Sequence, residues 1–263
     1  MNFYWVYDLP EWQFFVLCNL LFISFSLLGA FFFRSKFEKM FSLSVEHNSI
    51  VSTFIATSGV FYGITLGLIA VGTFENYNSV ESTVNNESSS LASLYRDVEL
   101  LEDSSNTKML ATLKNYTYYT VDTAWELQKK GILTNRGTQM MNSFQKELSS
   151  YKPKSEKDKI MFTEALKQFN VLIGDRRLRL NTVNSALPSA IWIILFLGAF
   201  VNIALTWCLV INNKKLDIIM NVLSGLLLGS LIFLIASLDN PYRGEFSVSS
   251  QAFQVLIDDL LVK

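Results

Sequence analysis

The chain has 263 residues, of which 50% are hydrophobic and only 17% are charged. Because a soluble domain usually carries about a quarter charged residues, this composition is typical of a membrane protein. The net charge of −1 excludes the basic surface of a nucleic-acid-binding protein, so no nucleic-acid partner is expected. The sequence has one histidine, no paired metal-ligand spacing and no glycine-rich phosphate loop, so we expect no cofactor, no metal site and no enzyme activity.

Four apolar runs, at residues 12–33, 50–74, 187–211 and 216–238, are each long enough to cross a bilayer as a helix, which takes about 20 residues. They predict an all-α polytopic membrane protein with four transmembrane helices. The chain then divides into an N-terminal transmembrane pair at 1–73, an extramembrane helical bundle at 74–186 inserted between helices 2 and 3, a C-terminal transmembrane pair at 187–238, and a turn with an amphipathic tail at 239–263.

The polar middle region shows helical periodicity throughout. The second apolar run enters it without a turn signal, and helices are expected from Thr107 to Gly131, over 138–151, and from a cap at Ser155 toward the third span. We therefore expect the outer bundle helices to be continuous with spans 2 and 3. The helix that begins at Thr107 has an apolar face made of Met109, Leu110, Leu113, Tyr116, Val121, Ala124 and Leu127. The tail has one made of Phe253, Leu256, Ile257 and Leu260.

The two short loops carry the basic residues that set the orientation. Arg34, Lys36 and Lys39 follow span 1, and Lys214 and Lys215 lie between spans 3 and 4, whereas the N-terminal tail has neither lysine nor arginine. By the positive-inside rule these loops are cytoplasmic, which places both termini and the bundle in the periplasm of a bacterial inner membrane. Three arginines close to span 3 favour the opposite orientation, with the bundle in the cytoplasm: Arg176, Arg177 and Arg179.

Small residues recur every three or four positions along span 2. The row consists of Ser52, Ala56, Gly59, Gly63 and Gly67, and span 4 repeats the pattern with Gly225 and Gly229. In lipid such a row lets another helix approach closely, so one interpretation is helix packing within or between subunits. The other interpretation is a pore lining. Because four spans are few for a pore in one chain, the path would then lie on the symmetry axis of a homo-oligomer.

Three asparagines lie inside the spans: Asn19, Asn202 and Asn221. An unpaired amide in hydrocarbon costs free energy, so each should face another helix or a wet cavity. An interhelical hydrogen bond of this kind is worth about 1 kcal/mol or less.

Charged residues gather where spans 2, 3 and 4 meet the outer surface: Glu75, Glu81, Glu87, Arg176, Arg179, Asp239 and Arg243. Antiparallel neighbouring helices would bring the glutamates level with the arginines. They would form either a structural stalk of ion pairs or the charged vestibule of a pore. Glu87 falls on the apolar seam between Val84 and Leu91, so its carboxylate needs a partner. The arginines of 176–179 are the candidates.

Several motifs, spread over nearly the whole chain, resemble those of the bacterial bestrophin-like membrane proteins. They are Tyr7-Asp8-Leu9-Pro10, GVFYGITLGLIAVGTFENY at 59–77, Glu87-Ser88-Ser89-Ser90-Leu91 with Leu94-Tyr95-Arg96, Leu187-Pro188 with Trp192, and Leu238-Asp239-Asn240-Pro241-Tyr242-Arg243-Gly244. The resemblance marks six positions without giving them roles: Glu75, Glu87, Arg96, Asp239, Pro241 and Gly244.

Distant kinship of that family with bestrophins, which are pentameric anion channels, implies ion conduction by analogy. We therefore interpret the chain as an oligomeric ion channel or transport protein, with span 2 lining the path and an inorganic anion as the permeant partner. Phe54 and Phe61 are candidates, by position only, for a phenylalanine-lined neck. Bestrophins place their termini and soluble mass in the cytoplasm, opposite to the topology that the short basic loops predict. The alternative is a non-conducting envelope protein whose outer bundle binds a partner or senses an external condition.

Overall fold

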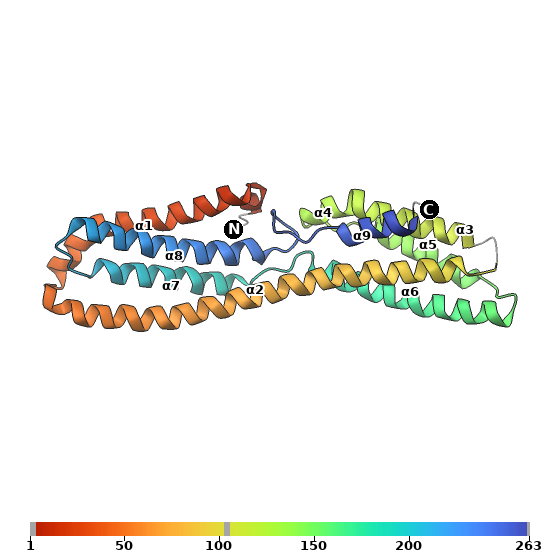
Figure 1. The fold of residues 1–263 in the computed structure, drawn as a ribbon, viewed down its shortest axis with the longest axis horizontal. Helices are drawn as coiled ribbons and strands as arrows, with labels where there is room; N and C mark the ends of the chain where they lie inside the picture. The colour runs from red at the N-terminus through yellow and green to blue at the C-terminus, as the bar shows by residue number, and fades with distance from the viewer. Residues whose placement is uncertain (1–3, 103–105, 262–263) are drawn as a thin grey trace. The chain divides into compact units, whose positions relative to one another are not determined.

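The computed structural model describes residues 4–102 and 106–261 (Figure 1). The ends of the predicted first and last regions, 1–3 and 262–263, and residues 103–105 of the middle region lie outside the described residues. Within the described ranges every regular element is a helix, and four helices are long and apolar enough to cross a membrane. This confirms the prediction of an all-helical chain with four transmembrane helices.

The chain forms two compact units. Unit 1 comprises residues 1–76, 186–240 and 244–246, and unit 2 comprises residues 77–185, 241–243 and 247–263. The first part of helix α2 belongs to unit 1 and the rest to unit 2.

Unit 1 contains the apolar helices. Its elements are η1 (Tyr4–Asp8), α1 (Glu11–Met40), η2 (Val45–His47), the first part of α2 (Asn48–Glu99), α7 (Ser189–Trp207) and α8 (Lys214–Asp239). Helices α1 and α8 lie side by side. A small apolar core joins α2, α7 and α8 through Tyr62, Leu66, Leu195, Ala199, Ile203, Trp207, Leu228, Ile232 and Ile235. Many side chains that face away from this core are apolar and exposed, as expected for helices surrounded by lipid.

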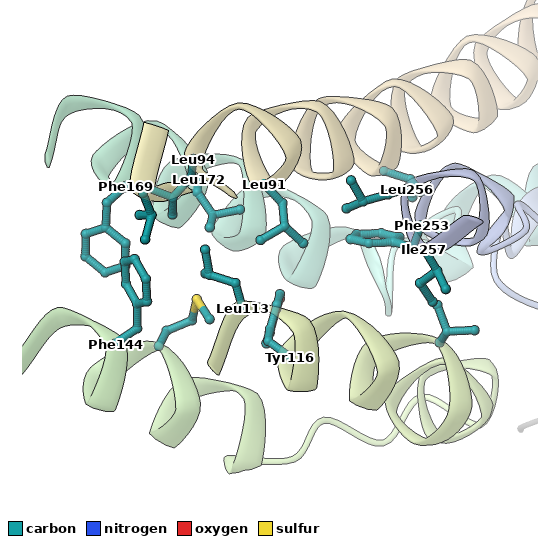
Figure 2. Close-up of a cluster of buried hydrophobic side chains, with 14 of the residues drawn as sticks. Leu91, Leu94, Leu113, Tyr116, Phe144, Phe169, Leu172, Phe253, Leu256 and Ile257 are labelled. Carbon is teal, nitrogen blue, oxygen red and sulfur yellow. The ribbon is translucent and has the colours of Figure 1, made fainter. Parts of the chain in front are cut away.

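Unit 2 is a helical assembly around one apolar core. Its elements are the rest of α2, α3 (Asn106–Tyr119), the π-helical turn η3 (Thr120–Ala124), α4 (Trp125–Lys129), α5 (Arg136–Ser150), α6 (Glu156–Thr182), α9 (Gln251–Leu256) and the π-helical turn η4 (Ile257–Leu261). Figure 2 shows Leu91 of α2, Leu113 of α3 and Phe144 of α5 converging in this core. Ser155 caps α6, as the sequence predicts, by accepting a hydrogen bond from the Asp158 N–H at 3.1 Å.

The apolar face of the C-terminal tail is part of this core. Phe253, Leu256 and Ile257 are buried beside Leu91 and Tyr116 (Figure 2). The tail is therefore held by the same burial of apolar area that stabilises the rest of unit 2.

The structure differs from the sequence prediction at the start of the third span. Helix α6 ends at Thr182 and α7 begins at Ser189, so the expected continuous helix is interrupted over residues 183–188. The physical reason is Pro188, which has no N–H to donate and disfavours helical geometry at the residue before it. Helix α2, which contains no proline, runs unbroken from Asn48 to Glu99.

Candidate functional site

The small-residue row of α2 is open. Among the described residues, no atom outside the local helix lies within 4 Å of a Cβ built on Gly63 or Gly67, and the nearest atom to one on Gly59 is Asn202 Oδ1 at 3.9 Å. Ser52 and Ala56, which continue the row, are exposed. This face of α2 therefore makes almost no contact with its own chain.

An adjacent face of α2, about 100° around the helix from the row, is fixed within unit 1. The Tyr62 hydroxyl donates a hydrogen bond to the Leu195 carbonyl oxygen at 2.6 Å. Its ring lies so close to Gly198 that a Cβ on that residue would approach it to 2.3 Å. Leu66 is buried one turn later. These contacts orient the glycine row outward.

The glycines of α8 have the opposite environment. A Cβ on Gly225 would lie 2.6 Å from the Ile23 Cα, and one on Gly229 would lie 2.9 Å from the Asn19 Cα. These two residues therefore allow the backbones of α1 and α8 to touch. The structure brings the α8 row into helix packing within one chain, which it does not do for the α2 row.

Hydroxyl groups and phenyl rings occupy other exposed sides of α2, and Phe54 and Phe61 lie about 160–180° around the helix from Gly63. Thr53 and Thr57 donate hydrogen bonds to backbone carbonyls four residues earlier, at 2.8 and 2.9 Å. Their donors are satisfied locally, which leaves oxygen lone pairs on the surface. Phe54 and Phe61, the two neck candidates, are 63% and 70% exposed.

All three intramembrane asparagines pair with other helices. Asn19 Oδ1 accepts from Ser230 at 3.1 Å, and Asn202 Oδ1 accepts from Ser58 at 3.1 Å. Asn221 Oδ1 accepts from Ser26 at 3.0 Å and from Thr206 at 3.3 Å. Each amide thus bonds a helix other than its own, as the cost of an unpaired polar group in lipid requires.

The charged residues of unit 2 centre on Glu87, whose side chain is completely buried. Arg179 donates from Nε to Glu87 Oε2 at 2.6 Å and from Nη1 to Gln128 Oε1 at 2.5 Å. The Tyr116 hydroxyl donates to Glu87 Oε1 at 2.5 Å. This network connects α2, α3, α4 and α6 through one carboxylate and one guanidinium.

The network keeps the Arg179 guanidinium charged and the Tyr116 phenol protonated. Burial alone would lower the pKa of Arg179, but the negative charge of Glu87 and the hydrogen bonds to it raise that pKa above its usual value. Burial, and then the Glu87 charge, raise the pKa of Tyr116, so its hydroxyl stays a donor. The Arg179 guanidinium also lies 5.5 Å from the centre of the Trp125 ring and 5.6 Å from that of the Phe253 ring. Cation–π attraction to these rings further stabilises the buried guanidinium.

The remaining charges of the predicted group do not join this network as ion pairs. Arg176 donates to the Tyr116 hydroxyl and to Thr138 Oγ1, both at 3.1 Å. Glu75 and Glu81 are exposed, and neither forms an ion pair within the described part of the chain. In unit 1, the Asp239 carboxylate accepts from the Leu187 N–H at 2.5 Å and from Trp192 Nε1 at 3.3 Å. Arg243 is half-buried in unit 2.

Comparison with known proteins identifies the family. Residues 20–253 match the sequence profile of the Bestrophin-like domain. The chain belongs to this bestrophin-like family. No curated protein sequence matches the bestrophin-like chain.

Solved structures share the fold of the bestrophin-like chain. A variant of a bacterial bestrophin homologue from Klebsiella pneumoniae superposes with a TM-score of 0.69 at 13% identity, covering 94% of this chain and 97% of that one. Another crystal structure of that homologue, phased on zinc, gives a TM-score of 0.65 at 11% identity over 94% and 97% of the two chains. A crystal structure described as a membrane protein gives 0.69 at 11% identity over 93% and 97%. At these identities the likeness concerns the fold, and the chain is accordingly a multi-pass membrane protein.

Segments that are far apart in this bestrophin-like chain meet in unit 1. The Tyr7 hydroxyl donates to the Ala236 carbonyl at 2.9 Å and accepts from Asn240 Nδ2 at 2.8 Å. Gly244 has a φ of +83°, and a Cβ there would lie 3.4 Å from the Tyr7 ring. Together with the contacts of Asp239, these bonds connect the segments near residues 7, 187 and 239.

Sequence periodicity missed Gln128 and Trp125. The chain from Thr107 to Gly131 reads as one α-helix with Leu127 on its apolar face, but a π-helical turn at Thr120–Ala124 shifts the register. Gln128 and Trp125 are therefore buried around Arg179, whereas Leu127 is only half-buried. No residue pattern in the sequence marks that turn.

An open hollow of about 400 Å³ lies on unit 2 between α2 and the C-terminal segment. Its lining includes Asn85, Ser89, Arg96, Val255 and Asp259. Arg96, one of the family motif positions, contributes an exposed guanidinium to it. This hollow is a surface on which unit 2 could receive a small partner.

Proposed function

We propose that this chain assembles as a homo-oligomer that conducts ions, with the open small-residue face of α2 lining the path. The observation that carries the proposal is the empty space beside Gly63 and Gly67, on a helix whose adjacent face is fixed by Tyr62 and Leu66. An inorganic anion is the permeant species by analogy with the bestrophins.

The location of the path follows from the number of helices. Unit 1 has four candidate spans, and its core fills the space between α2, α7 and α8. A path inside one chain is therefore poorly supported, whereas a symmetry axis between copies can be lined by one α2 face from each. Small side chains there leave room for an ion and its water.

Within this proposal the buried charges stabilise unit 2 and do not face the path. Glu87 is 0% and Arg179 1% exposed, so neither can attract an ion from solution. The structural stalk is the interpretation that their burial supports. Of the glutamates predicted to line a vestibule on α2, Glu75 and Glu81 have exposed carboxylates that could line a charged mouth.

Conduction is tested by chloride and potassium flux through purified protein in liposomes. Gly63→Leu places a bulky side chain on the row, and we expect it to abolish flux. Gly72→Leu is the matched control, because Gly72 also has no neighbour within 4 Å but lies about 140° around the helix from Gly67. Absence of flux in the wild type under varied voltage, pH and calcium would overturn the proposal, as would equal effects of the two variants.

The orientation forms a second part of the proposal. In this proposal residues 34–39 and 214–215 face the cytoplasm of a bacterium, and unit 2 and both termini face the periplasm, because the short loops are basic. A cysteine at the exposed position Ser143, with Cys18 and Cys208 replaced by alanine, should react with an impermeant thiol reagent while the inner membrane is intact. Labelling only after permeabilisation would reverse the orientation.

The open hollow on unit 2 favours one second candidate, a non-conducting envelope protein that binds a partner or senses a condition at this surface. The two candidate functions predict that different substitutions impair the protein. Arg96→Gln should impair only the partner-binding function, and Gly63→Leu should impair only conduction. A wild type that passes no ions, together with a cellular phenotype of Arg96→Gln, would favour this alternative.

A further inference from the structure

One end of unit 1 is held together by polar contacts between helix ends. Arg34 forms an ion pair with Asp217 near the start of α8 and donates from Nη2 to the Thr206 carbonyl of α7 at 3.2 Å. The Asn48 side chain accepts from the Val210 N–H at 3.0 Å and donates to the Val210 carbonyl at 2.9 Å. The loop 41–47 and the loop 208–213 therefore lie at the same end of the unit.

Four lysines at this end are exposed: Lys36, Lys39, Lys214 and Lys215. Within the described ranges 4–102 and 106–261, none of them forms an ion pair with a carboxylate. The positive charge of Arg34 is already paired with the Asp217 carboxylate. Two other carboxylates, Glu38 and Glu46, are close in sequence, so four positive and two negative charges leave an excess of two positive charges.

Exposed aromatic side chains lie close in sequence to Lys36 and Lys39 at the end of α1. Phe31 is 81% and Phe41 59% exposed, and the Lys36 ammonium lies 5.6 Å from the centre of the Phe33 ring. Exposed rings of this kind lie in the hydrocarbon and at its boundary, while lysine stems extend along them and hold the ammonium groups among the lipid headgroups.

We propose that this basic end, defined by Lys36, Lys39, Lys214 and Lys215, binds the phosphate groups of anionic phospholipids. Their ammonium groups form no ion pair with a described carboxylate, and the rings at the end of α1 would bring them to the level of the headgroup phosphates. A phosphatidylcholine headgroup carries its own cation, so it leaves less net negative charge for the lysines. The selectivity should therefore be for net charge and independent of whether the protein conducts ions.

The test uses the full-length protein in neutral detergent and counts bound lipids by native mass spectrometry. Phosphatidylglycerol and phosphatidylcholine with identical acyl chains are compared, and inorganic phosphate is added as a competitor. The test variant carries Lys36→Gln, Lys39→Gln, Lys214→Gln and Lys215→Gln. The control variant removes four exposed lysines of unit 2 that form no ion pair, with the substitutions Lys130→Gln, Lys146→Gln, Lys152→Gln and Lys157→Gln.

We expect the wild type and the control variant to prefer phosphatidylglycerol. Each lysine near the surface changes the affinity for an anionic lipid by about fivefold. The preference of the test variant for phosphatidylglycerol over phosphatidylcholine should therefore be at least about tenfold lower than that of the wild type. An unchanged preference in the test variant would overturn the proposal, and so would an equal loss in the control. Complete competition by inorganic phosphate at the lipid concentration would also overturn it, because the site would then recognise free phosphate.

Discussion

Two rows of small residues with the same spacing have opposite surroundings in unit 1. Gly225 and Gly229 of α8 press against the backbone of α1, where even a methyl group would meet Ile23 or Asn19. A Cβ built on Gly63 or Gly67 of α2 would meet no atom of another described element within 4 Å. The comparison shows that small-residue spacing permits close approach but does not say whether a helix of the same chain makes it.

The difference has a physical basis on the neighbouring helices. Asn19 on α1 bonds Ser230 of α8, so a polar contact reinforces the approach that the α8 glycines allow. On α2 the bulky contacts lie on an adjacent face, where Tyr62 fills the space above Gly198. The α2 row therefore remains available to a second copy of the chain.

The largest effect should come from closing the α8 row. Gly225→Leu forces a side chain into the α1 backbone, and we expect it to lower the free energy of unfolding by at least about 3 kcal/mol or to prevent folding. Gly72→Leu, on an open part of α2, should leave the fold intact. The measurement is the yield of monodisperse protein and its thermal unfolding in detergent. A stable Gly225→Leu protein would show that the α1–α8 packing is looser than the structure indicates.

The same contrast between packed and open positions applies to two glutamates of α2. Glu87→Gln leaves the Arg179 charge buried without its counter-ion and should cost about 3–5 kcal/mol of stability. Glu81→Gln, at an exposed position, should change stability by less than about 0.5 kcal/mol.

A double variant sharpens this test. Glu87→Gln combined with Arg179→Met removes both charges, so it should be less destabilised than Glu87→Gln alone. Thermal unfolding of the wild type and of each variant measures this order of stability. Equal melting of Glu87→Gln and the wild type would show that the ion pair does not stabilise unit 2.

A smaller, pH-dependent effect is expected at Asp158. Burial would raise the pKa of this carboxyl, but hydrogen bonds from the Tyr151 hydroxyl and from the N–H groups of Lys154 and Glu102 lower it below its usual 3.8. The folded state therefore prefers the ionised form. The stabilisation is present above about pH 4 and is lost as pH falls through the lowered pKa.

The pH dependence is measured as a difference between variants. Wild type should be more stable than Asp158→Asn near neutral pH, and the difference should shrink below about pH 4. Glu156→Gln, at the exposed neighbouring position of α6, should show little difference at any pH. A wild-type advantage that grows on acidification would contradict the assignment.

Most of the fold could be predicted because lipid imposes a strong pattern on sequence. The runs 12–33, 50–74, 187–211 and 216–238 each fall on a helix of unit 1, since an uncharged stretch of span length has few alternatives to a helix. Ser155 marked the start of α6 through its capping geometry. These features depend on residues close together in the chain.

The features that could not be predicted from the sequence depend on contacts between residues far apart in the chain. The sequence indicated that Glu87 needs an arginine, and the structure pairs it with Arg179, but Gln128 entered the network only through a π-helical turn. Which glycine row is packed depends on side chains of other helices, such as Asn19. Neither could be read from periodicity along one helix.

The most direct test of the central claim is thiol modification of Gly63→Cys in a background without Cys18 and Cys208. We expect a charged, water-soluble thiol reagent to reduce ion flux through this variant in liposomes, because the proposed path runs along the α2 row. Flux through Gly72→Cys should remain unchanged. A Gly63→Cys protein whose flux does not respond to the reagent, or a Gly72→Cys protein that responds equally, would contradict the account.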